Sequence, residues 1–173
     1  MNQRQPAAPI NPVRQPPAVG CGRGLLIGFL VAVAVAPAAG ALDLSSYRWQ
    51  HRLLVLAAPS AEDTALARQR ESLARRADAV DDRDLVVIEL YARGGGRLGE
   101  RALSEAEAAG LRERLRLATG DRALLLIGKD GGVKRRAPLD TELRGVFEQI
   151  DAMPMRRDEM RERRAAGQPV TPP

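Results

Sequence analysis

Short apolar runs alternate along the chain with longer stretches in which apolar residues recur at helical spacing. The runs have the length of buried strands. The predicted strands are residues 53–58, 85–91 and 123–127. Each longer stretch carries one apolar face and is predicted to be a helix. The predicted helices are residues 60–80, 104–118 and 143–150. An Asp-Gly turn at 130–131 predicts an antiparallel return strand from Val133 to Ala137.

The resulting order from Leu53 to Ile150 is β-α-β-α-β-β-α, which predicts an α/β fold: a thioredoxin-like three-layer sandwich with helices on both faces of the sheet. Because helices separate the first three strands, we expect parallel crossovers between them and an antiparallel edge from the hairpin. Residues 94–103 are predicted to be a loop. Pro154 ends the last helix and begins a short charged one, and residues 166–173 are expected to form a disordered tail.

Side chains that accept hydrogen bonds mark the predicted helix starts. Ser60 is expected to cap the first helix. Ser104 and Glu107 have the spacing of a capping box at the start of the second. Asp140 or Thr141 is expected to cap the third.

The first 41 residues differ from the rest and have the pattern of a secretory signal. They contain three arginines and no acid, an apolar run from Leu25 to Ala36, a break at Pro37, and then Ala39-Gly40-Ala41. We expect cleavage after Ala41, which leaves one domain at 42–165 and places the protein in the periplasm or outside the cell. The alternative is an uncleaved anchor, because residues 24–42 are just long enough to span a bilayer.

Charge and cysteine content exclude several functions. The formal net charge is +5, but three of the 27 basic residues and none of the 22 acidic residues lie in the predicted signal. The remaining charges are mixed in sign and aromatic residues are few, which argues against a nucleic-acid partner. Cys21, the single cysteine, precedes the apolar run. Residues 42–173 therefore have no thiol for a disulfide, thiol redox exchange, peroxidase chemistry or a thiolate metal site.

Several motifs together resemble one family. They are Trp49-x-x-Arg52-Leu53-Leu54, Gln69, Arg83-Asp84-Leu85, Ile127-Gly128-Lys129-Asp130-Gly131-Gly132-Val133-Lys134, and Ile150-Asp151-Ala152-Met153-Pro154-Met155-Arg156-Arg157-x-Glu159-Met160. From about Leu44 to Met160 the chain resembles domain-of-unknown-function family 4174. The resemblance implies a short exported bacterial protein, related to a domain of secreted animal matrix proteins such as Equarin and the sushi-repeat proteins.

The resemblance also implies a divergent relative of the peroxiredoxin and thioredoxin folds, and it brings no established reaction. In those folds the working cysteine lies around the start of the first helix. Residues 59–63 of this chain, Pro-Ser-Ala-Glu-Asp, have no cysteine there. The resemblance therefore supports the fold and weakens a redox function.

The hairpin and the Met-Pro-Met-Arg-Arg segment form the candidate interaction surface. Methionine adapts to varied partners, and arginine can bind carboxylates or phosphates through two nitrogens. The candidate residues are Lys129, Asp130, Asp151, Met153, Pro154, Met155, Arg156, Arg157 and Glu159. The structural alternative is that the methionines seal the end of the sheet. The arginines would then pair with nearby acids: Asp151, Asp158 and Glu159.

Other motifs fit simple structural roles. Gly128-Lys129-Asp130-Gly131-Gly132 lacks the spacing of a phosphate-binding loop and fits a hairpin turn. His51 is the single histidine, and Ser60 lies at the other end of the same predicted strand, too far away for a serine–histidine hydrolase pair. Trp49 is expected to anchor that strand in the core. We therefore predict no cofactor, no metal site and no catalytic residue.

The hypothesis that follows is an exported non-catalytic thioredoxin-like module that binds a protein or an anionic envelope component. One alternative is an enzyme of unknown reaction that uses Asp130, Asp151 and Arg156. A strongly shifted carboxyl pKa in a pocket would favour that alternative. The other alternative is a membrane protein held by an uncleaved signal.

Signal cleavage gives the first testable prediction. We expect the intact mass of the exported protein to correspond to a chain beginning at Leu42, because the small residues before it suit signal peptidase. A chain that still begins at Met1 would instead support the anchored form.

Overall fold

A mixed β-sheet forms the middle layer of the computed structural model, which describes residues 42–173. The predicted signal sequence, its cleavage site and Cys21 lie outside the described residues. The sheet has six strands in the order β4-β3-β2-β1-β5-β6. The strands are β1 (Arg52–Ala58), β2 (Leu85–Tyr91), β3 (Gly96–Leu98), β4 (Arg101–Leu103), β5 (Ala123–Ile127) and β6 (Val133–Pro138).

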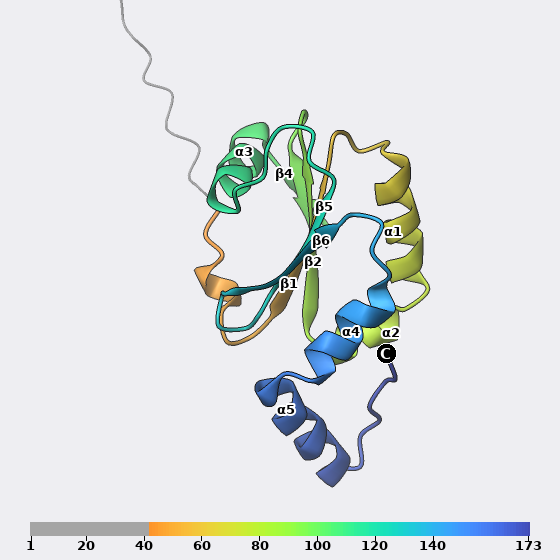
Figure 1. The fold of residues 1–173 in the computed structure, drawn as a ribbon. Coiled ribbons are helices and arrows are strands. Elements are labelled where there is room, and N and C mark those ends of the chain that lie inside the picture. Colours follow the sequence, from red (N-terminus) through yellow and green to blue (C-terminus); the bar gives the residue numbers. More distant parts are fainter. Residues whose placement is uncertain (1–41) are drawn as a thin grey trace, which may run out of the picture. The chain divides into compact units, whose positions relative to one another are not determined.

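Helices cover both faces of the sheet, as the thioredoxin-like prediction requires (Figure 1). The helices α1 (Thr64–Ala74), α2 (Ala77–Asp82) and α4 (Leu143–Asp151) lie on one face. The other face carries α3 (Glu105–Arg114) and the 3-10 helix η1 (Ser45–Tyr47). The charged helix α5 (Pro154–Ala165) lies beyond one end of the strands. The fold prediction is confirmed. Among residues 42–173, no helix combines the length and hydropathy of a membrane span.

The central strand β1 explains why the sequence forms this fold. Every residue of β1 is buried, because the strand has a neighbour on each side and a hydrophobic core on each face. Leu54 and Leu56 belong to the core under α1 and α4. Leu53 and Val55 belong to the core under α3. A continuous apolar run is what such a strand needs.

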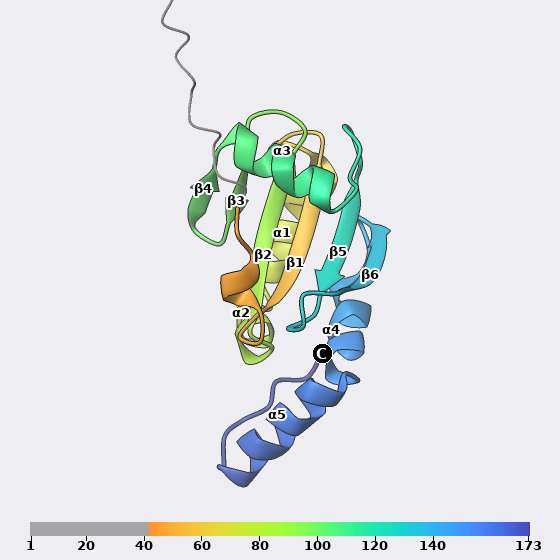
Figure 2. The ribbon, with the colours of Figure 1, turned by 90° about the vertical axis from the view of Figure 1, so that its left-hand side faces the viewer.

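The direction of β5 corrects the expectation of parallel crossovers. β1 and β2 are parallel, but β5 runs antiparallel to β1, with Leu53 opposite Ile127. Figure 2 shows the reason: α3 crosses one end of the strands sideways and does not return along their length. The chain therefore re-enters the sheet at the end where β2 left it, and β5 must run in the opposite direction.

The predicted loop at 94–103 contains the hairpin of β3 and β4, which extends the sheet beyond β2. Each strand has three residues, too few to show an alternating pattern. Glycine is needed here because the chain is crowded. A Cβ on Gly96 would overlap the carbonyl oxygen of Glu89, and one on Gly95 would overlap that of Leu103.

Helix starts and ends were predicted less well than the helices themselves. The predicted helix 60–80 is two helices, α1 and α2, separated at Arg76, whose φ of −124° and ψ of 31° leave the helical range. Asp63, not Ser60, caps α1, because its carboxylate accepts the N–H groups of Ala65 and Leu66. The cap of α4 is Glu142, which accepts no side-chain bond there, rather than Asp140 or Thr141. The capping box at α3 is confirmed.

The crowding around Gly96 gives a stability prediction. Gly96→Ala should lower the free energy of unfolding by about 1–3 kcal/mol, because the new methyl group meets backbone atoms that cannot move aside. Gly110→Ala is the matched control. Gly110 lies inside α3 with open space at its Cβ position, so the change should add about 0.5–1 kcal/mol. Urea unfolding measures both changes, and equal effects would contradict the packing argument.

Candidate functional site

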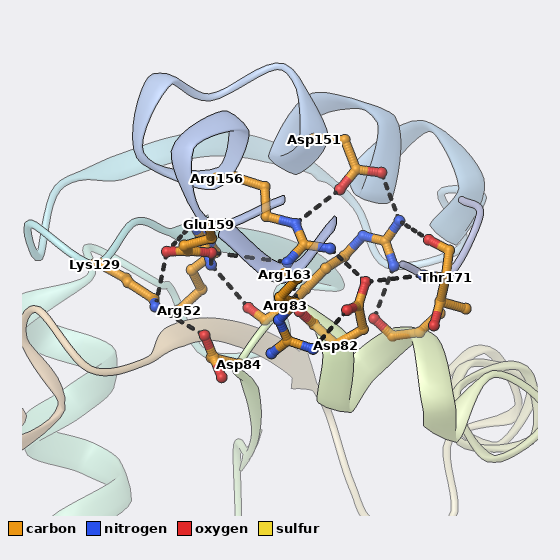
Figure 3. Close-up of polar contacts among 11 residues, drawn as sticks. Arg52, Asp82, Arg83, Asp84, Lys129, Asp151, Arg156, Glu159, Arg163 and Thr171 are labelled. Carbon is orange, nitrogen blue, oxygen red and sulfur yellow. Dashed lines mark hydrogen bonds and ion pairs between the residues drawn. The ribbon is translucent and has the colours of Figure 1, made fainter. Parts of the chain in front are cut away.

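A network of buried charges joins α5 to the end of the sheet (Figure 3). Five cations and four carboxylates take part, contributed by β1, α2, α4, α5 and the segments that follow α2 and β5. The cations are Arg52, Arg83, Lys129, Arg156 and Arg163, and the carboxylates are those of Asp82, Asp84, Asp151 and Glu159. We call this set the charge network.

Arg156 and Asp82 form its centre. Arg156 is 0% exposed and Asp82 is 5% exposed. One guanidinium nitrogen of Arg156 pairs with the Asp82 carboxylate, and another donates to the Asp82 backbone carbonyl at 2.6 Å. Its Nε donates to Asp151 at 3.2 Å, and Arg163 donates to the second carboxylate oxygen of Asp82 at 2.8 Å. Each buried charge therefore has an opposite charge beside it, as its removal from water requires.

Arg83 continues the network toward the chain terminus. It donates to Asp151 at 2.5 Å and to the carbonyl of Ala79 at 2.9 Å, and it lies 4.9 Å from the centre of the Phe147 ring. Arg83 also donates to the backbone carbonyl of Thr171 at 3.1 Å. The backbone N–H of Thr171 in turn donates to the Asp82 carboxylate at 3.2 Å. Within the segment 166–173, which was expected to form a disordered tail, residues 168–173 have no helix or strand, and two charged side chains bind the backbone of Thr171.

Arg52 and Lys129 meet Glu159 on the other side of the network. Arg52 donates to both carboxylate oxygens of Glu159, at 3.0 and 3.1 Å. Lys129 bridges Glu159 at 2.9 Å and Asp84 at 2.8 Å. Burial acts to raise the pKa of Glu159, but the bonds from Arg52 and Lys129 outweigh it and hold that pKa below its usual range. Glu159 is therefore ionised at neutral pH, which keeps the network paired.

These contacts settle the position of Arg156. It was expected to be part of an exposed binding surface, and the structure buries it completely. The structural alternative is correct for the pairing of Arg156 with Asp151 and Glu159, but it missed Asp82, which lies 74 residues earlier in the chain. Asp158 pairs instead with Arg161 on the exposed side of α5.

A surface hollow of about 320 Å³ lies beside the network, between the β5–β6 hairpin and the start of α5. We call it the Trp49 groove. Its lining residues are Trp49, Arg52, Gly128, Lys129, Asp130, Lys134, Met153, Pro154 and Met155. Trp49 is 62% exposed and Met155 is 40% exposed. Trp49 was expected to anchor the core, and this expectation is wrong.

The backbone explains why Trp49 points outward. Its φ is +67°, in the left-handed region that is costly for a bulky side chain. Its N–H donates to the carbonyl of Lys129 at 2.7 Å, which fixes this conformation against the hairpin. The Arg48 guanidinium lies 5.8 Å from the centre of its ring. The fold thus holds a large aromatic side chain in solvent at a cost in backbone strain.

The structure therefore divides the predicted site residues. It brings Lys129, Asp130 and the Met153-Pro154-Met155 segment together in the Trp49 groove. Asp151, Arg156 and Glu159 belong to the charge network, and Arg157 is exposed. Four lining residues of the groove were not among the predicted site residues: Trp49, Arg52, Gly128 and Lys134. One signal was available for Trp49, because it lies outside the apolar run of β1, among polar neighbours.

Asp130, one carboxylate of the enzyme hypothesis, does not have the raised pKa of a general acid. Asp130 accepts hydrogen bonds from Lys134 at 2.5 Å and from the Gly132 N–H at 3.1 Å, and these bonds lower its pKa. A general acid needs a raised pKa. Within residues 42–173, no cluster of three or more histidine, cysteine, aspartate or glutamate side chains could hold a metal ion.

A second, partly buried ion pair lies behind the start of α1, the region in which thioredoxin-like folds carry their cysteine. Arg70 donates to both oxygens of Glu89, at 2.8 and 2.6 Å, and to the hydroxyl of Tyr91 at 3.0 Å. The Tyr91 hydroxyl donates to Glu89 at 2.5 Å. Burial acts to raise the pKa of Glu89, and these bonds overcome it and lower that pKa. The group is satisfied internally, so we assign it a structural role.

The sheet order, the helix layers and the absence of any thiol from residues 42–173 define a thioredoxin-like domain without the thiol chemistry of that fold. The chain belongs to the family described as Domain of unknown function (DUF4174), whose model matches residues 43–159.

The chain is also similar to two curated proteins. Coiled-coil domain-containing protein 80 of Danio rerio is 32% identical over 133 residues, which cover 68% of this chain and 15% of the relative. Sushi repeat-containing protein SRPX of Homo sapiens is 30% identical over 133 residues, which cover 75% of this chain and 28% of the relative. The chain thus spans less than a third of the length of either protein.

A solved structure supports the fold. The reduced 2-Cys peroxiredoxin of Plasmodium vivax superposes with a TM-score of 0.50 at 15% identity, covering 66% of this chain and 84% of the peroxiredoxin. At this identity the likeness concerns the fold alone.

The neighbours Arg156 and Arg157 allow a matched test of the charge network. Arg156→Ala should lower the free energy of unfolding by about 3–5 kcal/mol, because it leaves Asp82 buried with fewer partners. Arg157→Ala should change it by less than about 0.5 kcal/mol, because that side chain is exposed. Chemical unfolding followed by circular dichroism measures both, and similar losses would contradict the assignment of Arg156 to a buried network.

Proposed function

We propose that this protein is an exported, non-catalytic thioredoxin-like module that binds a protein partner through the Trp49 groove. The observation that carries the proposal is the exposure of Trp49 and Met155 on either side of one hollow. Among residues 42–173 the large apolar side chains that reach this exposure are Trp49, Val133 and Met155, and all three lie at or beside the β5–β6 hairpin or the start of α5.

The side chains of the groove suit protein recognition. Tryptophan is enriched among the residues that contribute most to binding at protein interfaces, because it buries a large apolar area. Methionine lines surfaces that adapt to their partners. Lys134 and Asp130 stand at the rim, where charged residues orient a partner more than they add affinity.

The charge network supports the groove from below. Arg52 and Lys129 line the groove and also bind Glu159 of α5. The hairpin and the start of α5 are therefore tied to each other before any partner arrives. A surface organised in advance loses less entropy on binding, which favours affinity.

Sequence features support the other parts of the proposal. Residues 42–173 contain no cysteine, so the module has no thiol for redox chemistry. The N-terminal pattern of basic residues, an apolar run and small residues supports export. The curated relatives are much longer than the matched segment, which supports the view that this domain serves as one module among others.

Site-specific photo-cross-linking in the producing cells tests the binding surface. A photoreactive phenylalanine analogue in place of Trp49 should trap one protein species at high yield, because the side chain faces the partner. The same analogue at Arg144 is the control, since Arg144 is exposed on α4, away from the groove.

The captured species should then bind the purified protein, and Met155→Asp should weaken that binding at least tenfold by placing a charge in an apolar contact. The thermal midpoint of this variant should remain near that of the wild type, because Met155 is exposed. Equal capture from positions 49 and 144, or unchanged affinity of the Met155 variant, would overturn the proposal.

A further inference from the structure

A second and larger hollow, of about 540 Å³, opens on the other side of the β5–β6 hairpin. Its floor is formed by buried aliphatic side chains: Leu53 of β1, Leu111 of α3 and Ile127 of β5. Leu115 and the aromatic pair Tyr47 and His51, whose ring centres are 5.8 Å apart, continue the wall. We call it the Arg48–Arg114 groove, after the two cations at its rim. Its volume lies in the range of small-molecule sites.

Neither rim arginine forms an ion pair with a described carboxylate, and Arg114 acts on the neighbouring Asp43 only through its charge, which adds to the hydrogen bonds that lower the pKa of Asp43. In residues 42–173, neither Arg48 nor Arg114 forms an ion pair, and residues 1–41 contain no acidic residue that could supply one. Arg114 donates to the carbonyl of Leu42 at 3.1 Å. Arg48 lies against the hairpin turn, where a Cβ on Gly131 would come within 3.2 Å of its Nε. Both guanidinium groups thus retain N–H donors for a ligand.

The acidic residues of the rim are already bound within the protein. Asp43 accepts hydrogen bonds from the N–H and the hydroxyl of Ser45, at 2.8 and 2.5 Å. Asp130 is paired with Lys134 and the Gly132 N–H. Both carboxylates thus accept hydrogen bonds from donors of the protein, whereas neither rim arginine forms an ion pair with a described residue. The groove is therefore complementary to a molecule with an apolar body and one negative charge.

We propose that the Arg48–Arg114 groove binds a small amphipathic carboxylate, with its hydrocarbon part on the aliphatic floor and its carboxylate on the rim guanidinium groups. Arginine suits this role because its planar donors match a carboxylate. The apolar part supplies most of the affinity, and the arginines select the anion over neutral molecules of the same shape. This inference does not rest on the proposed protein partner. The two grooves share Gly128 and Asp130, but the apolar contacts of that proposal, Trp49, Met153 and Met155, line the other groove alone.

Calorimetric titration with decanoate, below the concentration at which it forms micelles, tests the proposal. The protein is used in the form that the producing cells make. Decanoate should bind at least tenfold more tightly than decanol, which has the same chain and no charge. The double variant Arg48→Gln/Arg114→Gln should lose at least tenfold in affinity for decanoate and less than twofold for decanol, because it removes charge and leaves the floor intact.

Two control variants show whether decanoate binding is specific to the Arg48–Arg114 groove. Arg68→Gln removes an exposed arginine of α1, on the opposite face of the sheet, and should leave decanoate binding unchanged. Met155→Asp should also leave it unchanged, which distinguishes a failure of this inference from a failure of the protein-binding proposal.

Vesicles with anionic lipids separate a free carboxylate from a membrane surface as the ligand, and we expect no co-sedimentation at physiological salt. Equal affinity for decanoate and decanol would overturn the proposal. Full affinity in the double variant, or binding to vesicles but not to decanoate, would also overturn it.

Discussion

The buried pair of Arg156 and Asp82 is the interaction on which the C-terminal third of this structure depends. It joins α5 to the end of α2, and Arg156 also donates to the Asp82 carbonyl, where a helix carries partial negative charge. Arg83, Arg163 and Thr171 gather around the same carboxylates. Five cations and four carboxylates can share so small a volume only because each has an opposite charge beside it (Figure 3).

This arrangement has a direct consequence for the surface. Met153, Pro154 and Met155 immediately precede Arg156 in the chain, so the burial of Arg156 fixes where they emerge. Lys129 and Arg52 belong both to the network and to the wall of the Trp49 groove. The apolar side chains of the Trp49 groove are thus held in place by the charge network. Such a surface is suited to recognition, because a partner does not have to order it on binding.

The sequence predicted the parts of the fold that depend on local pattern. Residues 53–58 had the unbroken apolar content of a central strand, and Ser104 with Glu107 had the spacing of a capping box. It could not predict the direction of β5, which depends on how α3 crosses the sheet. It also failed for Arg156, since no local pattern shows that Asp82 lies opposite. The groove segment 153–155 was predicted as a surface, but the outward position of Trp49 needed the positive φ that only the structure shows.

Residues of the β5–β6 hairpin turn line both grooves, and the sequence neighbours Arg48 and Trp49 line different ones. Gly128 and Asp130 line the two grooves alike, whereas Arg48 belongs to one and Trp49 to the other. The left-handed backbone at Trp49 and its bond to Lys129 place the tryptophan ring in the Trp49 groove, with the Arg48 guanidinium 5.8 Å from the ring centre. At the opposite end of the sheet, where related folds carry a thiol, Arg70, Glu89 and Tyr91 satisfy one another. Both grooves thus lie beside the hairpin, at the end of the sheet opposite the start of α1.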